Sequence, residues 1–173
     1  MQKLVLGALA MVVAMPAQPA APPSATYVPS ADVAATVKQM NPAAVSDRQI
    51  RMIDAGSYHV GVGVVQRPGS AKQGSIEHDK LTEVYYVIEG TGTLVTGGQQ
   101  VDGTSLSPDS ATYRELAGPG MTGTGINGGE SRRVTPGDVV IIPQGVPHWF
   151  SGIDGTIKYL VVRVDPERLL QKK

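Results

Sequence analysis

The chain of 173 residues contains no cysteine. This absence excludes disulfide bonds, thiolate catalysis and zinc or iron–sulfur sites with cysteine ligands, and it leaves the stability of the fold to packing alone. A lipoprotein is excluded for the same reason, because no cysteine is present to be acylated.

Aromatic side chains and unbalanced charge are also scarce. The chain has one Trp and one Phe, and its 15 basic and 15 acidic side chains cancel. Nucleic-acid-binding proteins usually present a basic run or a series of stacking aromatics, and this sequence has neither. We therefore expect no nucleic-acid partner.

The amino-terminal residues are typical of a secretory signal peptide. Lys3 precedes an uncharged apolar run over residues 4–15, which is too short to span a bilayer comfortably. Small residues and prolines crowd residues 17–25, and cleavage is expected in that window. We assign residues 1–21 to the signal peptide and expect an exported protein, periplasmic or secreted, with no stable membrane insertion after processing.

The remainder of the chain has the length of one domain with a core of its own. Residues 22–45 are predicted to form a proline-rich linker and a short helix, for which Ser30 is the expected N-cap and which runs to about Met40. Residues 46–173 are assigned to the main domain. Residues 166–171 are expected to add a final helical turn that begins with proline.

Short segments rich in Val, Ile, Tyr and Thr follow one another, with Gly, Pro or Asp between them. This rhythm predicts an all-β barrel or sandwich. The expected strands cover residues 49–53, 57–66, 75–78, 84–88, 92–95, 131–134, 138–142, 148–151 and 156–162.

The connection over residues 97–130 is much longer than a typical loop, which indicates a functional or partly disordered segment. Residues 118–123 (GPGMTG) match the dinucleotide-binding fingerprint formally. However, no strand is predicted before them and more glycines follow, so we expect no nucleotide site. The segment is expected either to extend the sheet or to form a lid over the barrel mouth, with Tyr113 and Arg114 available to meet a ligand.

One stretch near the carboxyl terminus is the strongest signal in the sequence. Gly137 precedes an apolar strand, Pro143 and Gly145 form a tight corner after it, and His148 opens the next strand. Four such residues at this spacing are rare by chance.

A second block lies upstream, where Glu83 follows His78 by five residues and Gly90 follows Glu83 by seven. Together the two blocks resemble the paired signatures of the cupin superfamily, over roughly residues 57–165. Ile76 is a departure, because it occupies the position of the first histidine, and Gly152 stands where the family often has asparagine. The resemblance implies a cupin-type antiparallel β-barrel, or jelly roll, with a short amino-terminal helix.

The resemblance further implies that His78, Glu83 and His148 face the barrel interior and hold one divalent transition metal. Imidazole and carboxylate ligands suit Fe, Mn, Ni, Cu or Zn, and the sequence does not choose among them. His59 is a candidate fourth ligand if its strand face is interior, and otherwise an ordinary hydrogen-bonded core residue. Glu83 could alternatively pair with Lys80 at the surface.

Three further residues are candidate pocket residues, although side chains of their kind more often belong to a core: Ile76, Tyr85 and Phe150. The expected function is that of a metal-dependent cupin enzyme acting on a small organic molecule. A dioxygenase-like reaction is favoured, because two histidines and one carboxylate leave room for oxygen. An isomerase or lyase, a non-catalytic cupin that binds a sugar-like molecule, and an assembly domain remain alternatives. Exposed edge strands could pair two copies into a homodimer.

Overall fold

The computed structural model describes residues 24–171. The apolar run of the predicted signal peptide, residues 4–15, lies outside the described residues, and export therefore stays a prediction. Among the described residues, no helix combines the length and the hydropathy needed to cross a membrane.

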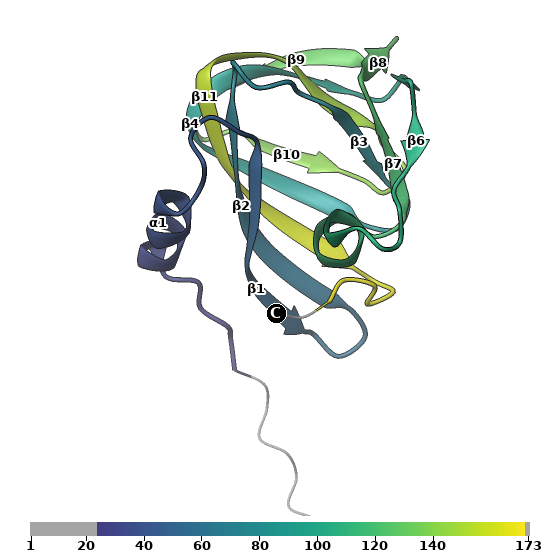
Figure 1. Ribbon diagram of the computed structural model, residues 1–173. Helices are drawn as coiled ribbons and strands as arrows, with labels where there is room; N and C mark the ends of the chain where they lie inside the picture. The colour runs from purple at the N-terminus through teal and green to yellow at the C-terminus, as the bar shows by residue number, and fades with distance from the viewer. Residues whose placement is uncertain (1–23, 172–173) are drawn as a thin grey trace, which may run out of the picture.

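Nearly all of the regular secondary structure of the described chain is β-strand, which confirms the predicted all-β fold (Figure 1). A short helix, α1 (Ser30–Lys38), comes first, and a π-helical turn, η1 (Tyr113–Ala117), interrupts the strands. The strands are β1 (Ser46–Asp54), β2 (His59–Pro68), β3 (Ser75–His78), β4 (Thr82–Thr96), β5 (Gln99–Val101), β6 (Thr104–Ser105), β7 (Gly120–Gly123), β8 (Gly125–Asn127), β9 (Glu130–Val134), β10 (Val139–Ile142) and β11 (His148–Asp165).

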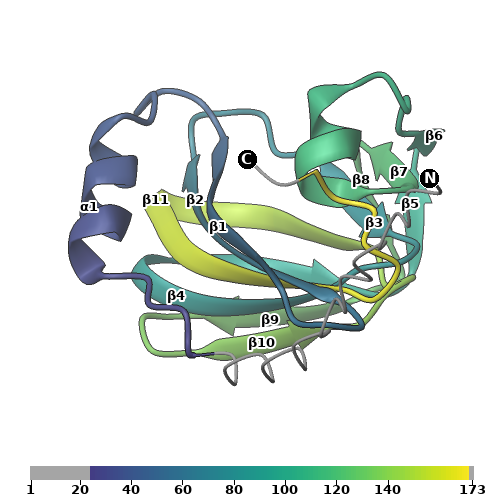
Figure 2. The ribbon, with the colours of Figure 1, turned by 90° about the horizontal axis from the view of Figure 1, so that it is seen from below.

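Strand pairing is antiparallel throughout and is organised around β11. This long strand pairs with β2 on one side and with β4 on the other, and its first residue also pairs with β3. The order β1-β2-β11-β3-β7-β6 forms one path through the sheet, and β4 carries β9 and β10. Seen from below in Figure 2, the strands curve around a common interior, with α1 at one end and η1 at the other.

Two pairs of predicted strands proved to be single strands. Residues 84–88 and 92–95 both belong to β4, and residues 148–151 and 156–162 both belong to β11. Gly90 and Gly155, which suggested turns, have positive φ angles of 77° and 69°. They lie where the β4–β11 register shifts, so the strands bend without ending, as strands do at β-bulges.

The predicted carboxyl-terminal helical turn is wrong. Pro166 begins only a turn, and Arg168 has a φ of 57°, which a right-handed helix does not allow. The segment is held differently, because the Asp165 carboxylate accepts hydrogen bonds from the backbone N–H groups of Leu169 and Leu170. At the other end of the chain, α1 ends at Lys38, two residues earlier than expected.

The core lies between the facing strands and follows the alternation of side chains along them. Phe150 belongs to this core, and its ring centroid is 5.8 Å from that of Tyr159. The buried cluster consists of Val65, Tyr85, Val87, Leu94, Val134, Ile142, Phe150, Ile157, Tyr159 and Val161.

Part of the long connection extends the main sheet, as one of the two predictions had it. β7 pairs with β3 and β6 in that sheet, whereas β5 and β8 form a separate two-stranded sheet. The dinucleotide-like glycines lie largely in β7, where Gly120 is required for close packing, since a Cβ there would overlap the carbonyl oxygen of Glu77. The fingerprint therefore reflects backbone packing in a strand, not a phosphate-binding turn before a helix.

Candidate metal centre

Three buried side chains converge from three different strands. His78 ends β3, Glu83 lies near the start of β4, and His148 begins β11. Glu83 Oε2 lies 3.3 Å from His78 Nε2 and 3.4 Å from His148 Nε2. One ligand atom from each residue lies within 4.8 Å of the other two, so the predicted convergence is confirmed.

The glycine-proline corner before β11 brings the two histidines together. Gly145 has a positive φ of 72°, and its backbone N–H donates to the His78 carbonyl oxygen at 2.7 Å. The first residue of β11, His148, pairs in register with Ile76 of β3. The motif that stood out in the sequence therefore joins the two histidine-bearing strands directly.

Both imidazole rings are oriented by backbone carbonyl groups. His78 Nδ1 lies 3.1 Å from the Ala117 oxygen, and His148 Nδ1 lies 3.1 Å from the Val146 oxygen. A carbonyl only accepts hydrogen bonds, so each Nδ1 carries the hydrogen and each Nε2 of a neutral ring presents a lone pair. Histidines that bind metals are usually oriented through the other ring nitrogen in this way.

The lone pairs point at a carboxylate, an arrangement that needs a positive charge between the groups. His148 Nε2 is buried without a hydrogen-bond partner among the described residues. Burial by itself would raise the pKa of Glu83, but His78 and Arg163 hold it well below its usual range. The cluster offers two imidazole nitrogens and one ionised carboxylate oxygen, a donor set that is compatible with a single metal ion.

A proton can take the place of that ion at His78. Burial by itself would lower the pKa of His78, yet the nearby Glu83 carboxylate outweighs it and raises the pKa above its usual value. A metal ion would therefore compete with a proton for the same nitrogen.

Glu83 is held by two residues besides the histidines. Its Oε1 accepts from Arg163 Nε at 2.9 Å, and its Oε2 accepts from the Tyr85 hydroxyl at 2.9 Å. The alternative pairing of Glu83 with Lys80 is wrong, because Lys80 forms its ion pair with Glu167 at 2.8 Å.

Sequence reasoning missed Arg163, which is buried and also binds Asp47 and Gln49. One signal was available in the sequence. Arg163 interrupts an alternating apolar row of β11, in which Tyr159 and Val161 precede it on the same face. A charged side chain in such a row requires an interior partner.

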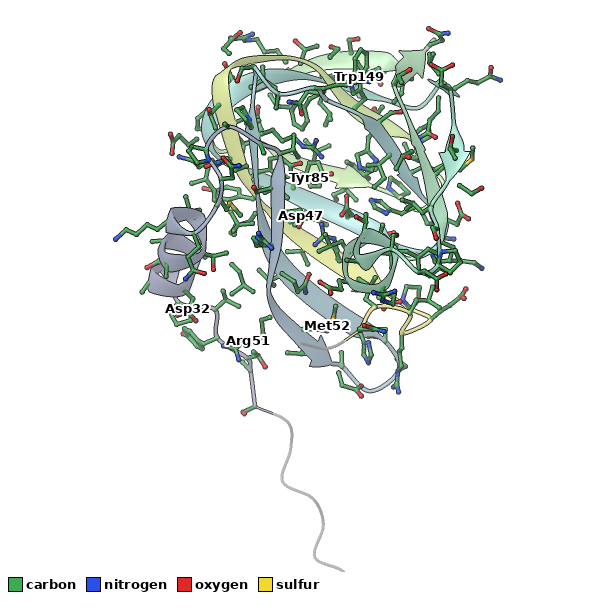
Figure 3. All side chains as sticks on the ribbon, viewed as in Figure 1. Asp32, Asp47, Arg51, Met52, Tyr85 and Trp149 are labelled. Atoms are coloured by element: carbon green, nitrogen blue, oxygen red, sulfur yellow. The ribbon has the colours of Figure 1, made fainter. Side chains whose placement is uncertain are left out.

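A cavity of about 280 Å³ opens beside this cluster. Ile76 and Tyr85 line it, in agreement with the pocket prediction, whereas the core residue Phe150 is not part of the wall. Tyr85 and Asp47 are labelled in Figure 3. The wall is formed by Val45, Asp47, Arg67, Ile76, His78, Glu83, Tyr85, Thr112, Leu116, Ala117, Tyr159 and Arg163.

The π-helical turn η1 forms part of the cavity wall, but not with the side chains expected. Leu116 and Ala117 of η1 and Thr112 just before it line the cavity, whereas Tyr113 and Arg114 do not. The Arg114 guanidinium instead donates to the backbone oxygen of Asp109. Ala117 also accepts the His78 hydrogen bond, so this segment both lines the cavity and orients a candidate ligand.

His59 is not brought to the other three residues. Its position in β2 pairs with Asp165, while Gly61, two residues further on, pairs with Arg163. His59 Nδ1 lies 3.9 Å from Asp165, and His59 Nε2 lies 3.9 Å from Asp54. The register thus places this buried histidine beyond the cluster, among carboxylates at the end of β11.

The family assignment follows from the sequence that builds this site. The family described as Cupin matches residues 68–167, more than half of the chain, and the protein belongs to the cupin family. None of the curated proteins matches the chain.

Several solved structures resemble the chain at low identity. The DMSP lyase DddQ from Ruegeria pomeroyi is 18% identical over 69% of this chain and 46% of its own, with a TM-score of 0.43. BH2720 from Bacillus halodurans is 14% identical over 84% and 86%, with a TM-score of 0.46. The polyketide cyclase RemF from Streptomyces resistomycificus is 23% identical over 72% and 66%, with a TM-score of 0.40. The chain thus spans less than half the length of DddQ, and these similarities do not indicate a shared activity.

Proposed function

We propose that the protein is a mononuclear metal-dependent cupin enzyme that acts on a small organic molecule. The observation that carries this proposal is the arrangement of His78 Nε2 and His148 Nε2, which face Glu83 Oε2 at 3.3 and 3.4 Å. A metal cation would stabilise two lone pairs and an anion at this separation, and a proton on His78 can do so in its place. A set of two histidines and one carboxylate is typical of non-haem iron oxygenases, and dioxygenase-like chemistry is therefore the first expectation.

The residues around the set have distinct tasks in this proposal. A bound divalent ion would supply a Lewis-acidic centre with open positions toward the cavity. Arg163 keeps Glu83 ionised and fixes its orientation, and backbone oxygens fix both rings. The cavity of about 280 Å³ is at the lower end of ligand-pocket sizes, which favours a small substrate.

Tyr85 favours isomerase or lyase chemistry as a second candidate. Its hydroxyl lies in the cavity wall and donates to Glu83 Oε2 at 2.9 Å. Burial and the Glu83 carboxylate raise the pKa of Tyr85 well above its usual value, so the phenol keeps its proton at Oη. A proton held at this position could serve proton transfer to a substrate, a step that lyases and isomerases need.

Metal analysis of the purified protein tests the proposal. We expect about one transition-metal ion per chain after reconstitution, and its loss in His148→Ala. His59→Ala is the matched control, because it also removes a buried histidine but lies outside the cluster. A protein that takes up no ion, or that loses it equally in both variants, would contradict the metal centre.

Activity assays on the loaded protein then separate the reaction classes. Oxygen uptake that depends on substrate supports the dioxygenase, whereas turnover under anaerobic conditions supports the lyase or isomerase. A metal-free protein that is stabilised by small molecules would instead be the non-catalytic binding cupin.

We also propose export and self-association, on separate grounds. Export follows from the signal peptide predicted over residues 1–21, and sequencing of the mature amino terminus would test it by a new start within residues 17–25.

For the homodimer, the support is strand β10, which pairs only with β4 among the described strands. Val139 and Ile141 of β10 are 61% and 67% exposed, and antiparallel pairing of two copies of this edge would cover them. Light scattering would show a dimer that Ile141→Glu dissociates. A monomeric wild-type protein would exclude the homodimer.

A further inference from the structure

The cavity wall contains two arginines, and only one of them forms ion pairs with carboxylates of the described chain. Arg163 binds the carboxylates of Glu83 and Asp47, so that its charge is balanced within the protein. Arg67 forms no ion pair with any carboxylate in the described part of the chain, although it lines the same cavity. Because Arg163 engages both carboxylates directly, the Arg67 guanidinium is available to an anionic ligand that enters the cavity.

Neutral groups hold Arg67 in a fixed position. Its Nε donates to the Tyr159 hydroxyl at 2.8 Å, and one terminal nitrogen donates to Gln73 Oε1 at 3.3 Å. Gln73 is itself fixed, because its amide donates to two backbone oxygens at 2.9 Å. The Arg67 Cζ atom also lies 5.8 Å from the centroid of the Phe150 ring. The Arg67 guanidinium is therefore ordered before any ligand binds, which lowers the entropic cost of binding.

The second terminal nitrogen of Arg67 makes no hydrogen bond to another described residue. It is also not one of the fully buried atoms without a partner, so part of its surface is exposed and a ligand can reach it. A guanidinium presents its N–H groups in a geometry that matches a carboxylate.

The charge balance of the cavity points in the same direction. The two arginines offset Asp47 and Glu83, so a divalent ion at the histidines would leave the cavity positive. Tyr85 adds no negative charge, because its hydroxyl donates a hydrogen bond to Glu83 and therefore carries its proton.

We propose that the substrate is a small carboxylic acid whose carboxylate binds Arg67, while its reactive part faces His78 and Glu83. The inference rests on the proposed function and deepens it by naming the substrate class. Carboxylates short enough for a cavity of about 280 Å³ are expected, and bulky acids are excluded.

Binding of matched acid and amide pairs tests this assignment. Propionate with propionamide, and lactate with lactamide, differ mainly in charge, and their affinities can be measured by calorimetry. The titrations are run on the full-length protein without metal, in chelator, and again with Mn²⁺. The titration without metal tests the role of Arg67 even if the metal proposal fails. A separate titration with Mn²⁺ and no acid tests metal binding.

Arg67→Met removes the charge, and Arg67→Lys keeps the charge without the planar guanidinium. Arg133→Met is the control, because it removes an arginine at the surface. In the wild type each acid is expected to bind at least about tenfold more tightly than its amide, as for a charge-assisted hydrogen bond. Arg67→Met should remove this preference, Arg67→Lys should retain part of it, and Arg133→Met should leave it intact.

Equal affinity for acid and amide in the wild type would overturn the assignment. An acid preference that survives Arg67→Met would do the same, as would the absence of measurable acid binding. If Arg67→Met does not fold, loss of the preference in Arg67→Lys supports the assignment and full retention contradicts it.

Discussion

Replacing Arg163 by methionine would test the charge network that holds Glu83 in place. Arg163 is buried, and its guanidinium donates to Glu83, Asp47 and Gln49. Methionine has a similar length but no charge, so Arg163→Met leaves two carboxylates in the interior without their cation. Breaking a buried ion pair by removing one partner costs about 3–5 kcal/mol.

That cost translates into a large thermal shift. A domain of this size loses about 2–4 °C in Tm for each kcal/mol, so Arg163→Met should lower the Tm by about 6–20 °C. Circular dichroism melts near neutral pH, in the presence of a chelator, would measure the shift without any contribution from metal binding.

Two further variants make the result specific. Arg132→Met removes an exposed arginine paired with Glu130 and should change the Tm by no more than about 2 °C. Adding Asp47→Asn to Arg163→Met removes one of the stranded charges and should restore part of the loss. A Tm for Arg163→Met within about 2 °C of the wild type would refute the reasoning, because the two carboxylates would then not depend on Arg163.

The remaining predictions concern the site and the packing around it. Ile76→His places an imidazole in the cavity wall, in register with His148. Competition titration should show Mn²⁺ or Zn²⁺ binding that is about tenfold tighter or more. The control Val139→His, on the exposed edge, should leave the affinity unchanged. Phe150→Ala should cost about 3–5 kcal/mol in chemical denaturation, since Phe150 is 3% exposed, and an unchanged unfolding midpoint would contradict its place in the core. Gly120→Ala should lower the Tm more than Gly128→Ala, because a Cβ at Gly120 meets the Glu77 backbone, whereas space at Gly128 is open and only its positive φ opposes alanine.

The candidate site shows how far local patterns reach. The spacing of His78 to Glu83 and the corner before His148 carried the resemblance to the cupin signatures, and that resemblance implied that the three residues meet, as they do. Phe150 was harder to assign, since alternation puts it on the same face as His148 and does not say how far along β11 the cavity extends.

Residues distant in sequence were beyond such reasoning. Arg163 reaches Asp47 across 116 positions, and only the pairing of β1, β2 and β11 brings them together. His59 shares an interior face with the site residues, but the β2–β11 register places it opposite Asp165. Register depends on the whole sheet, so a single strand cannot reveal it.

The sequence by itself determined the all-β class through strand alternation and turn residues, and the cupin resemblance carried by its two motifs implied the three candidate ligands. Tertiary structure alone decided which charges neutralise one another, that η1 lines the cavity, and that Arg67 faces it without a carboxylate partner among the described residues. Those features depend on distances between strands, which are set by packing and register and not by any short stretch of residues.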